Sequence, residues 1–399
     1  MTYIIDSIRT PIGNFGGTLK DIRTDDLAAI PIKELIKRTK IDPNKINDII
    51  MGCANQAGED NRNIARMALL LAGVPYKVPG ETVNRLCASG MSSVIHAHRA
   101  IISGDGDIFI AGGVENMTRG PWVISKSSKA FGRDSKMYDS SFGWRFINPK
   151  MKELYGIDGM GQTAENLAQK YNISREDQDF FAYKSQMKAK KAQNNGRFRE
   201  EITPVTIPQR KKEPIIFCKD EFIKENTTLK ILSSLRTAFK KEDGTVTAGN
   251  SSGLNDGAAA MLLASEKGIK ENQLNPIAKI ISSAVIGVEP RIMGIGPVMA
   301  TNLALKKAGI SMDKIDIIEI NEAFSVQSLA CIREWNLDDN DIRINPNGGA
   351  IALGHPLGAS GTRIIQTAAI ELQKQKKEYA LITMCIGVGQ GYATIIKRV

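Results

Sequence analysis

The stretch Leu35-Ile-Lys-Arg-Thr-Lys-Ile-Asp-Pro-Asn-Lys-Ile46 recurs 269 residues later as Ala304-Leu-Lys-Lys-Ala-Gly-Ile-Ser-Met-Asp-Lys-Ile315, with two lysines and two isoleucines in register. Further along, Ala88-Ser89-Gly90 returns as Ala359-Ser360-Gly361, now at an offset of 271 residues, and each triplet opens a helical pattern. A drift of two residues is typical of small loop insertions. An internal repeat of this kind predicts that one supersecondary unit occurs twice.

Each half also contains an apolar segment that ends in glycine, which predicts a buried strand followed by a turn. These segments are Ile108-Phe-Ile-Ala-Gly-Gly113 and Leu381-Ile-Thr-Met-Cys-Ile-Gly387. Strands that alternate with helices predict an α/β fold, here one of duplicated α/β domains. We expect an N-terminal half over residues 1–120 that continues at about 246–272, and a C-terminal half over residues 273–399.

The segment between the halves, residues 121–245, is richer in lysine and serine and is interpreted as an inserted loop domain. It contains one clear helical pattern, with Ser174 as the N-cap and a stop at Asn194-Asn195-Gly196. The expected apolar face of this helix is formed by Phe180, Phe181 and Met187. Two roles are open for the insert: a cover over part of the surface, or a cover over a ligand site.

The composition indicates a globular protein with more than one hydrophobic core, because 399 residues exceed the size of an ordinary single core. No apolar run approaches the roughly 18 residues that a membrane helix needs. An acid at Asp6 precedes any apolar stretch, which argues against a secretory signal. We therefore expect a cytoplasmic protein with no membrane partner.

The five cysteines are widely scattered and form no C-x-x-C pair, so we expect neither a disulfide framework nor a metal site. The net charge of +10 is explained either by a solvated lysine-rich surface or by a basic rim that attracts an anionic ligand. Nucleic acid is not an expected partner, since the basic residues are dispersed and are not interleaved with aromatic ones.

Cys87 lies at a predicted strand-to-helix turn. It follows the extended run Thr82-Val83-Asn84-Arg85-Leu86 and precedes a helical stripe that starts at Met91. The N-terminus of a helix stabilises a thiolate through its free N–H groups and its dipole. A lone cysteine in this position is also common as a buried structural residue. Other motifs in the chain are needed to decide between a reactive and a structural role for Cys87.

The glycine-rich run from Asn345 to Gly361 supplies a partner for that thiol, His355. Glycines at this density indicate a backbone that turns sharply and approaches a ligand closely. Imidazole titrates near neutrality, so His355 is a candidate base for a cysteine. His96 and His98 are interpreted as ordinary helix residues, because two residues of separation place them on different faces.

Two further candidates follow apolar strands of the second half. Cys385 closes one strand and enters Ile386-Gly387-Val388-Gly389, whose free N–H groups could form an oxyanion hole. Asn321 follows the strand Ile317–Ile320. In a parallel α/β sheet the carboxyl ends of the strands carry the site, so we expect these residues to meet there.

Together these motifs resemble the thiolase family, and the likeness spans nearly the whole chain. The matching blocks are Asn84-Arg-Leu-Cys-Ala-Ser-Gly-Met91, Asn321-Glu-Ala-Phe324, Gly348-Gly-Ala350 through Gly354-His-Pro356, and Cys385-Ile-Gly387. The resemblance implies the thiolase fold, in which duplicated α/β domains form a layered αβαβα arrangement with an inserted loop domain. It also implies a homodimer or a dimer-of-dimers tetramer.

The resemblance further implies a role for each matching residue. Cys87 is the acylated nucleophile, His355 activates it, and Cys385 is the acid/base for the acetyl-CoA carbanion. Asn321 holds a water that faces the thioester oxygen together with His355, and the N–H groups of Cys87 and Gly387 form a second oxyanion hole. Coenzyme A is a co-substrate, acyl-CoA is the other partner, and no permanently bound cofactor is expected.

The resemblance also extends to CoA contacts. The run Thr247–Gly257 is similar to the family's CoA-contact stretch and points to Ala248 and Ser252. The other expected substrate- and CoA-binding residues are Leu235, Met160, Ala323, Phe324 and Lys224. Lys224 departs from the arginine that many members carry near the nucleotide. Gly159 stands where members specific for acetoacetyl-CoA carry a histidine, which argues against strict acetoacetyl-CoA specificity.

Among thiolases, the 3-oxoadipyl-CoA subgroup is the most similar. The supporting strings are Gly52–Asn63, Gly143–Pro149 and Pro290–Gly294. The implied reaction converts 3-oxoadipyl-CoA and CoA into succinyl-CoA and acetyl-CoA, and Arg133 or Arg145 of the insert could pair with the distal carboxylate. The alternatives are an acetoacetyl-CoA thiolase, a general fatty-acid 3-ketoacyl-CoA thiolase and, remotely, a non-catalytic acyl-CoA-binding protein.

Overall fold

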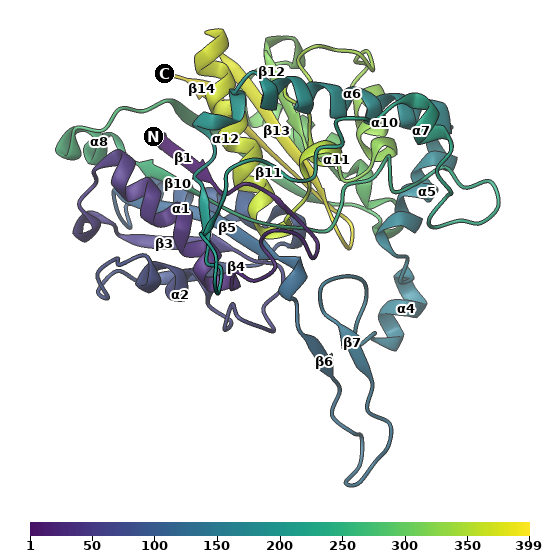
Figure 1. The fold of residues 1–399 in the computed structure, drawn as a ribbon. Helices are drawn as coiled ribbons and strands as arrows, with labels where there is room; N and C mark the ends of the chain where they lie inside the picture. Colours follow the sequence, from purple (N-terminus) through teal and green to yellow (C-terminus); the bar gives the residue numbers. More distant parts are fainter.

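The computed structural model describes residues 1–399 and is built around one large mixed sheet (Figure 1). The strand order is β12-β13-β14-β11-β1-β10-β5-β3-β4, and the short β2 pairs with β10. The strands are β1 (Tyr3–Arg9), β2 (Gly13–Asn14), β3 (Asp48–Gly52), β4 (Gly80–Val83), β5 (Ile108–Asn116), β10 (Asn255–Ala264), β11 (Ala278–Gly287), β12 (Ile317–Ile320), β13 (Tyr379–Ile386) and β14 (Gln390–Arg398).

The two halves of this sheet have the same topology, which confirms the duplication. The order β11-β14-β13-β12 repeats β1-β10-β5-β3, with one parallel pair at the end of each series, β12 with β13 and β3 with β5. All other pairs in the two series are antiparallel, so the expectation of a parallel sheet was wrong. The halves meet where β1 pairs with β11 over only two positions, Tyr3 with Lys279 and Ile4 with Ala278.

Helices cover both faces of each half and give the expected five layers. On one outside lie α1 (Thr24–Thr39) and α2 (Ile64–Leu71), on the other α9 (Gly296–Ala308) and α10 (Ser325–Glu334), and between the halves lie α3 (Ser89–Ser103) and α12 (Leu357–Gln375). Three buried apolar clusters fill the spaces between layers. The central cluster joins Val94 of α3 and Ile364 of α12 to Phe109 of β5 and Ile382 of β13.

The repeated Ala-Ser-Gly triplets bring α3 and α12 into backbone contact. A Cβ on Gly361 would lie 2.2 Å from the backbone nitrogen of Met91, and one on Gly90 would lie 2.5 Å from the carbonyl oxygen of Gly358. The Thr362 hydroxyl donates a hydrogen bond to the Gly90 carbonyl at 3.0 Å. Glycine is required here because the start of each central helix rests directly on the other.

The chain between β5 and β10 forms the insert. Its elements are β6 (Trp122–Ile124), β7 (Met137–Asp139), α4 (Pro149–Tyr155), α5 (Met160–Tyr171), α6 (Arg175–Asn194), β8 (Val205–Ile207), β9 (Ile215–Phe217) and α7 (Leu229–Ser233). The β6–β7 hairpin projects from the body of the molecule with α4 beside it (Figure 1). Two further helices lie outside the insert, α8 (Glu266–Asn272) and α11 (Ala350–Leu353), and none of the helices is long and apolar enough to cross a membrane.

The predicted helix of the insert is α6. The Ser174 side chain accepts a hydrogen bond from the Asp177 N–H, and the helix ends at Asn194, as expected. Phe181 is buried, but Phe180 is 43% exposed, so its place on the apolar face was wrong. Consecutive residues of a helix are about 100° apart, and here the inward face follows Phe181, Ala182 and Ser185.

Buried charges attach the insert to the first half. The Arg9 guanidinium of β1 donates hydrogen bonds to both carboxylate oxygens of Asp220, at 2.7 and 2.9 Å, and to Glu201 at 3.2 Å. All three side chains are almost completely buried. Bidentate guanidinium–carboxylate pairs have a narrow geometry, so this network holds the insert in one position relative to β1.

Candidate functional site

Cys87 lies in a single 3-10 turn, Leu86–Ala88, between β4 and α3. Leu86 has a φ of 47°, so the backbone is left-handed just before the cysteine and the extended run expected up to Leu86 stops earlier. The Asn84 carboxamide oxygen accepts the Leu86 N–H at 2.8 Å, and the Ser89 hydroxyl accepts the Arg85 N–H at 2.9 Å. Strain of this kind persists only where neighbouring bonds over-determine the turn.

The backbone N–H of Gly387 lies near the Cys87 sulfur and lowers the pKa of its thiol. Gly387 follows β13, and a Cβ at this position would lie 3.3 Å from Leu86 Cδ1 and 3.8 Å from Met160 Sδ. The next residue, Val388, has a φ of 63°. The second half of the chain therefore presents a backbone donor directly to the thiol of the first half, with Met160 beside both.

Cys385 lies at the end of β13, fully buried, and pairs with Gly391 of β14. Burial raises the pKa of its thiol well above the ordinary value, and the neighbouring Cys87 raises it further. Burial also raises the pKa of Cys87 to about 11, against the opposing effect of the Gly387 N–H. Both sulfurs are thiols at neutral pH in the free protein.

His355 lies between α11 and α12 and is 4% exposed. Its Nδ1 is 2.6 Å from the Ser360 hydroxyl, which itself donates to the Pro356 carbonyl at 2.9 Å. The hydroxyl hydrogen is used in that second bond, so the hydroxyl oxygen accepts from Nδ1–H and Nε2 carries the lone pair. Nε2 faces the Asn321 side-chain amide at 3.4 Å.

Burial keeps His355 neutral. It lowers the pKa of the imidazole to about 3, and the positive charge of Arg363 lowers it further. Arg363 is itself buried on α12, 3.7 Å from the Glu319 carboxylate of β12. At neutral pH the imidazole is therefore unprotonated at Nε2.

The expected catalytic residues fall into two groups. Asn321 contacts His355, whereas Gly387 lies near Cys87 and Cys87 lies close enough to Cys385 to raise the pKa of its thiol. Helix α12, which follows His355, packs against the turn that carries Cys87. The carboxyl ends of β4, β12 and β13 supply Cys87, Asn321 and Cys385. His355 comes instead from the turn before α12.

The expected CoA-binding residues form a second group beside this one. Met160, Leu235, Ala323 and Phe324 belong to one apolar cluster. The Ser252 N–H donates to the Ala323 carbonyl at 3.0 Å, and Gly249, the neighbour of Ala248, packs against Leu235. The Lys224 ammonium lies outside the cluster, 5.0 Å from the centre of the Phe222 ring, and Phe222 packs against Gly253.

Sequence reasoning missed three supporting residues. Ser360 orients His355 from within a triplet that the repeat had singled out only for its glycine. Asn255 accepts the His355 N–H at 2.9 Å, and Glu115 accepts N–H groups from Ala54, Asn55 and Gly358 at 2.9 to 3.0 Å. Burial raises the pKa of Glu115 to about 7. The contacts of Asn255 and Glu115 join residues distant in the chain, so no local pattern signals them.

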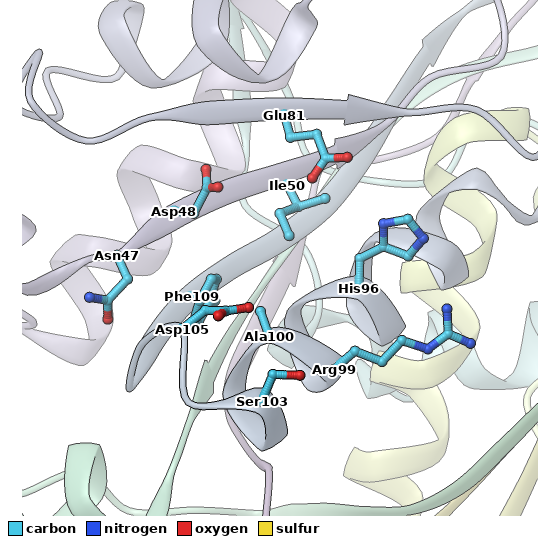
Figure 2. Close-up of a pocket in the computed structure, with 10 residues that line it drawn as sticks. All are labelled: Asn47, Asp48, Ile50, Glu81, His96, Arg99, Ala100, Ser103, Asp105 and Phe109. Carbon is cyan, nitrogen blue, oxygen red and sulfur yellow. The ribbon is translucent and has the colours of Figure 1, made fainter.

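A separate pocket of about 400 Å³ lies between β3, β4 and α3 (Figure 2). Asp48, Glu81, His96 and Arg99 are among the side chains that line it. None of the expected site residues does. His98 points elsewhere and contacts the Thr2 hydroxyl at 2.9 Å, so the two helix histidines lie on different faces as predicted.

Comparison with known families identifies the class of protein. Residues 2–267 match the thiolase N-terminal domain and residues 274–398 match the thiolase C-terminal domain. The chain belongs to the thiolase family.

Individual relatives narrow the comparison. The chain is 55% identical to a beta-ketoadipyl-CoA thiolase of Acinetobacter baylyi and 53% identical to a 3-oxoadipyl-CoA/3-oxo-5,6-dehydrosuberyl-CoA thiolase of Escherichia coli, in both cases over 100% of this chain and 99% of the relative. Among solved structures, the acetyl-CoA acetyltransferase of Bacillus anthracis superposes with a TM-score of 0.93 at 38% identity, and human mitochondrial 3-ketoacyl-CoA thiolase with 0.91 at 39%. Each alignment covers 100% of this chain and 98% of the other.

Proposed function

We propose that this thiolase is a CoA-dependent acyltransferase that cleaves 3-oxoadipyl-CoA to succinyl-CoA and acetyl-CoA through an acyl-enzyme on Cys87. Full-length identities of 53 to 55% with enzymes named for this substrate support the reaction. The observation that supports the proposed site is the proximity of Cys87, Cys385 and the Gly387 N–H, with the His355–Asn321 pair placed just before the helix that packs on the Cys87 turn.

In the first half-reaction, His355 Nε2 takes the Cys87 thiol proton and the sulfur attacks C3 of the 3-oxoacyl group. The C2–C3 bond then breaks, and its electron pair leaves as the enolate of acetyl-CoA. The Cys385 thiol gives its proton to C2, which releases acetyl-CoA and leaves a succinyl thioester on Cys87. The high pKa of Cys385 suits a group that must hold a proton until a basic carbanion forms.

In the second half-reaction, the Cys385 thiolate takes the proton of incoming CoA, whose sulfur attacks the succinyl carbonyl. Cys87 leaves and recovers its proton from His355, so the cycle closes without net change in the enzyme. Asn321, a water that it holds, and His355 would face the thioester oxygen in one oxyanion site, and the N–H groups of Cys87 and Gly387 would form the other. No metal or redox group enters this cycle.

CoA would lie along the apolar cluster. Met160, Leu235, Ala323 and Phe324 would line the pantetheine tunnel, and Ala248 and Ser252 would contact CoA where their loop meets Ala323. Lys224 forms no ion pair and would meet the nucleotide phosphates. The insert, proposed to span residues 121–245, supplies Met160, Lys224 and Leu235 and so would shield the thioester from water.

Acetoacetyl-CoA is the alternative substrate, and Gly159 argues against it as the preferred one. Gly159 is exposed, and a Cβ built on it meets no atom within 4 Å, so no protein atom fills the space that a histidine would take. An acyl chain longer than acetyl would then extend past Met160. The test is to supply purified protein and CoA with 3-oxoadipyl-CoA, acetoacetyl-CoA and longer 3-oxoacyl-CoAs and to follow loss of the enolate absorbance. Equal kcat/KM for all of them would refute the substrate assignment.

Intact-mass spectrometry tests the two cysteine roles. Cys87→Ser should give no succinyl adduct, whereas Cys385→Ala should still form the adduct but lose about 10²- to 10⁴-fold in kcat, the usual contribution of a positioned acid or base. Cys218→Ser, which alters an exposed cysteine outside the site, is the control. An adduct on any residue other than Cys87 would overturn the assignment.

We also propose a homo-oligomer, as a dimer or a dimer of dimers, in the cytoplasm. The edge strand β4 has no neighbour on one side, and Trp122, Ile124 and Met137 are 58 to 70% exposed on the β6–β7 hairpin. Unpaired edges and clustered apolar side chains favour association between copies. Sedimentation velocity would measure the state, and a monomer at micromolar concentration would refute it.

A further inference from the structure

Two consecutive residues of the insert, Trp144 and Arg145, make hydrogen bonds to two different segments that border the proposed site. The Trp144 indole N–H donates to the Asp158 carbonyl at 3.2 Å, and Asp158 directly precedes Gly159 and Met160. On the other side, an Arg145 Nη1–H donates to the Ser140 carbonyl at 3.3 Å. Trp144 therefore contacts the segment that carries Met160, and Arg145 contacts the segment that contains Ser140.

The Ser140 segment is connected by hydrogen bonds to the turn that carries Cys87. The Asn55 side-chain amide donates to the Ser140 carbonyl at 3.2 Å, the same oxygen that Arg145 contacts. Its neighbour Ala54 accepts the Asn84 side-chain amide at 3.0 Å, and Asn84 in turn fixes Leu86. Arg145 is thus linked through a series of hydrogen bonds to the turn that carries Cys87, and its neighbour Trp144 contacts the segment that leads to Met160.

The charge of Arg145 is not neutralised by the protein. Its one hydrogen bond is to a carbonyl, and the side chain is only partly exposed. Arg291 differs, since it pairs with the Asp158 carboxylate at 3.0 Å. Arg85 also lacks an anion, but it donates to two side chains, Ser92 and Gln390, each at 3.0 Å. A half-buried guanidinium without an anion is costly, and a ligand carboxylate would offset that cost.

We propose that Arg145 binds the distal carboxylate of the acyl chain and selects dicarboxylic over neutral 3-oxoacyl-CoA, an inference that rests on the proposed function. A succinyl group on Cys87 places its carboxylate on the order of 5–6 Å from the sulfur, given ordinary bond lengths. The guanidinium keeps four free N–H donors for a bidentate contact. Arg133 does not fit, because it is exposed on the β6–β7 hairpin that projects from the body (Figure 1).

The test compares 3-oxoadipyl-CoA with 3-oxohexanoyl-CoA, which has the same length and a methyl group in place of the carboxylate. Arg145→Met should lower kcat/KM for 3-oxoadipyl-CoA by about 10- to 100-fold, as expected for loss of hydrogen bonds to a charged group. Its kcat/KM for 3-oxohexanoyl-CoA should stay within about twofold of wild type or rise. Arg145→Lys keeps the positive charge but not the two parallel N–H donors of a guanidinium, so its kcat/KM for 3-oxoadipyl-CoA should fall less.

Arg133→Met is the matched control and should leave kcat/KM for both substrates unchanged. An Arg145→Met variant that loses activity on both substrates equally, or on neither, would overturn the inference. Thermal unfolding of each variant separates misfolding from loss of recognition, and Arg145→Lys provides the same comparison if Arg145→Met does not fold. Failure of the proposed function has a different signature, since the wild-type protein itself would then not turn over 3-oxoadipyl-CoA.

Discussion

The hydroxyl of Ser360 lies 2.6 Å from Nδ1 of His355 and fixes which imidazole nitrogen carries the lone pair. A neutral imidazole has two tautomers, and only the one with its hydrogen on Nδ1 presents a basic Nε2 to the Cys87 side of the site. Ser360 is five residues further along the chain, on the first turn of α12.

Replacement of Ser360 by alanine should therefore slow acyl-enzyme formation by about tenfold or more, because the basic tautomer is no longer favoured. The burst phase with 3-oxoadipyl-CoA measures this step directly. Ser360→Thr keeps a hydroxyl and should retain most of the burst rate, while Ser311→Ala on the surface should have no effect. A normal burst in Ser360→Ala would show that the hydroxyl does not orient the base.

Thiol labelling should report the raised pKa of Cys87. With a pKa of about 11, the thiolate is a small fraction at pH 8 and grows as the pH rises. The rate of iodoacetamide addition to Cys87, measured by peptide mass spectrometry, should therefore keep increasing above pH 9.5. The exposed Cys218 serves as the internal reference for reagent and access. A plateau for Cys87 below pH 8.5 would mean that the free protein holds a thiolate.

Gly159→His should narrow the acyl pocket. The added side chain enters space in which a Cβ meets nothing within 4 Å, so the fold should tolerate it. We expect kcat/KM for 3-oxoadipyl-CoA to fall by about tenfold or more relative to acetoacetyl-CoA, since a clash with the chain costs on the order of 1–3 kcal/mol. Gly159→Ala is the control and should change the ratio little. An unchanged ratio in the histidine variant would place the acyl chain elsewhere.

Gly361→Ala tests the contact between the central helices. The new methyl group would lie 2.2 Å from the Met91 nitrogen, and neither backbone can move without disturbing Cys87 or His355. Overpacking of this kind destabilises a protein by about 1–3 kcal/mol, so the midpoint of thermal unfolding should fall by several degrees. Gly159→Ala, with no atom nearby, should leave the midpoint unchanged. Equal midpoints for the two variants would contradict the close packing.

Much of the candidate site could be predicted because several of its residues lie in short sequence motifs at the ends of strands. Asn321 directly follows β12, Cys385 lies at the end of β13, and Cys87 lies in the turn after β4, so short stretches of consecutive residues define all three positions. The duplication was equally readable, since Lys37, Ile41 and their repeats keep one register. The expectation of a parallel sheet was wrong, because the direction of strand pairing depends on which strands meet in the fold and not on the apolar pattern of each strand.

By itself the sequence determined the duplicated α/β plan and the family, and it proposed the reactive side chains, because these depend on short-range patterns and residue chemistry. Only the tertiary structure decided what surrounds them. The approach of the Gly387 N–H to Cys87, the contact of Gly361 with Met91 and the contact of Asn321 with His355 each join residues far apart in the chain. Such relationships follow from packing and hydrogen-bond geometry in three dimensions, which no local stretch of sequence encodes.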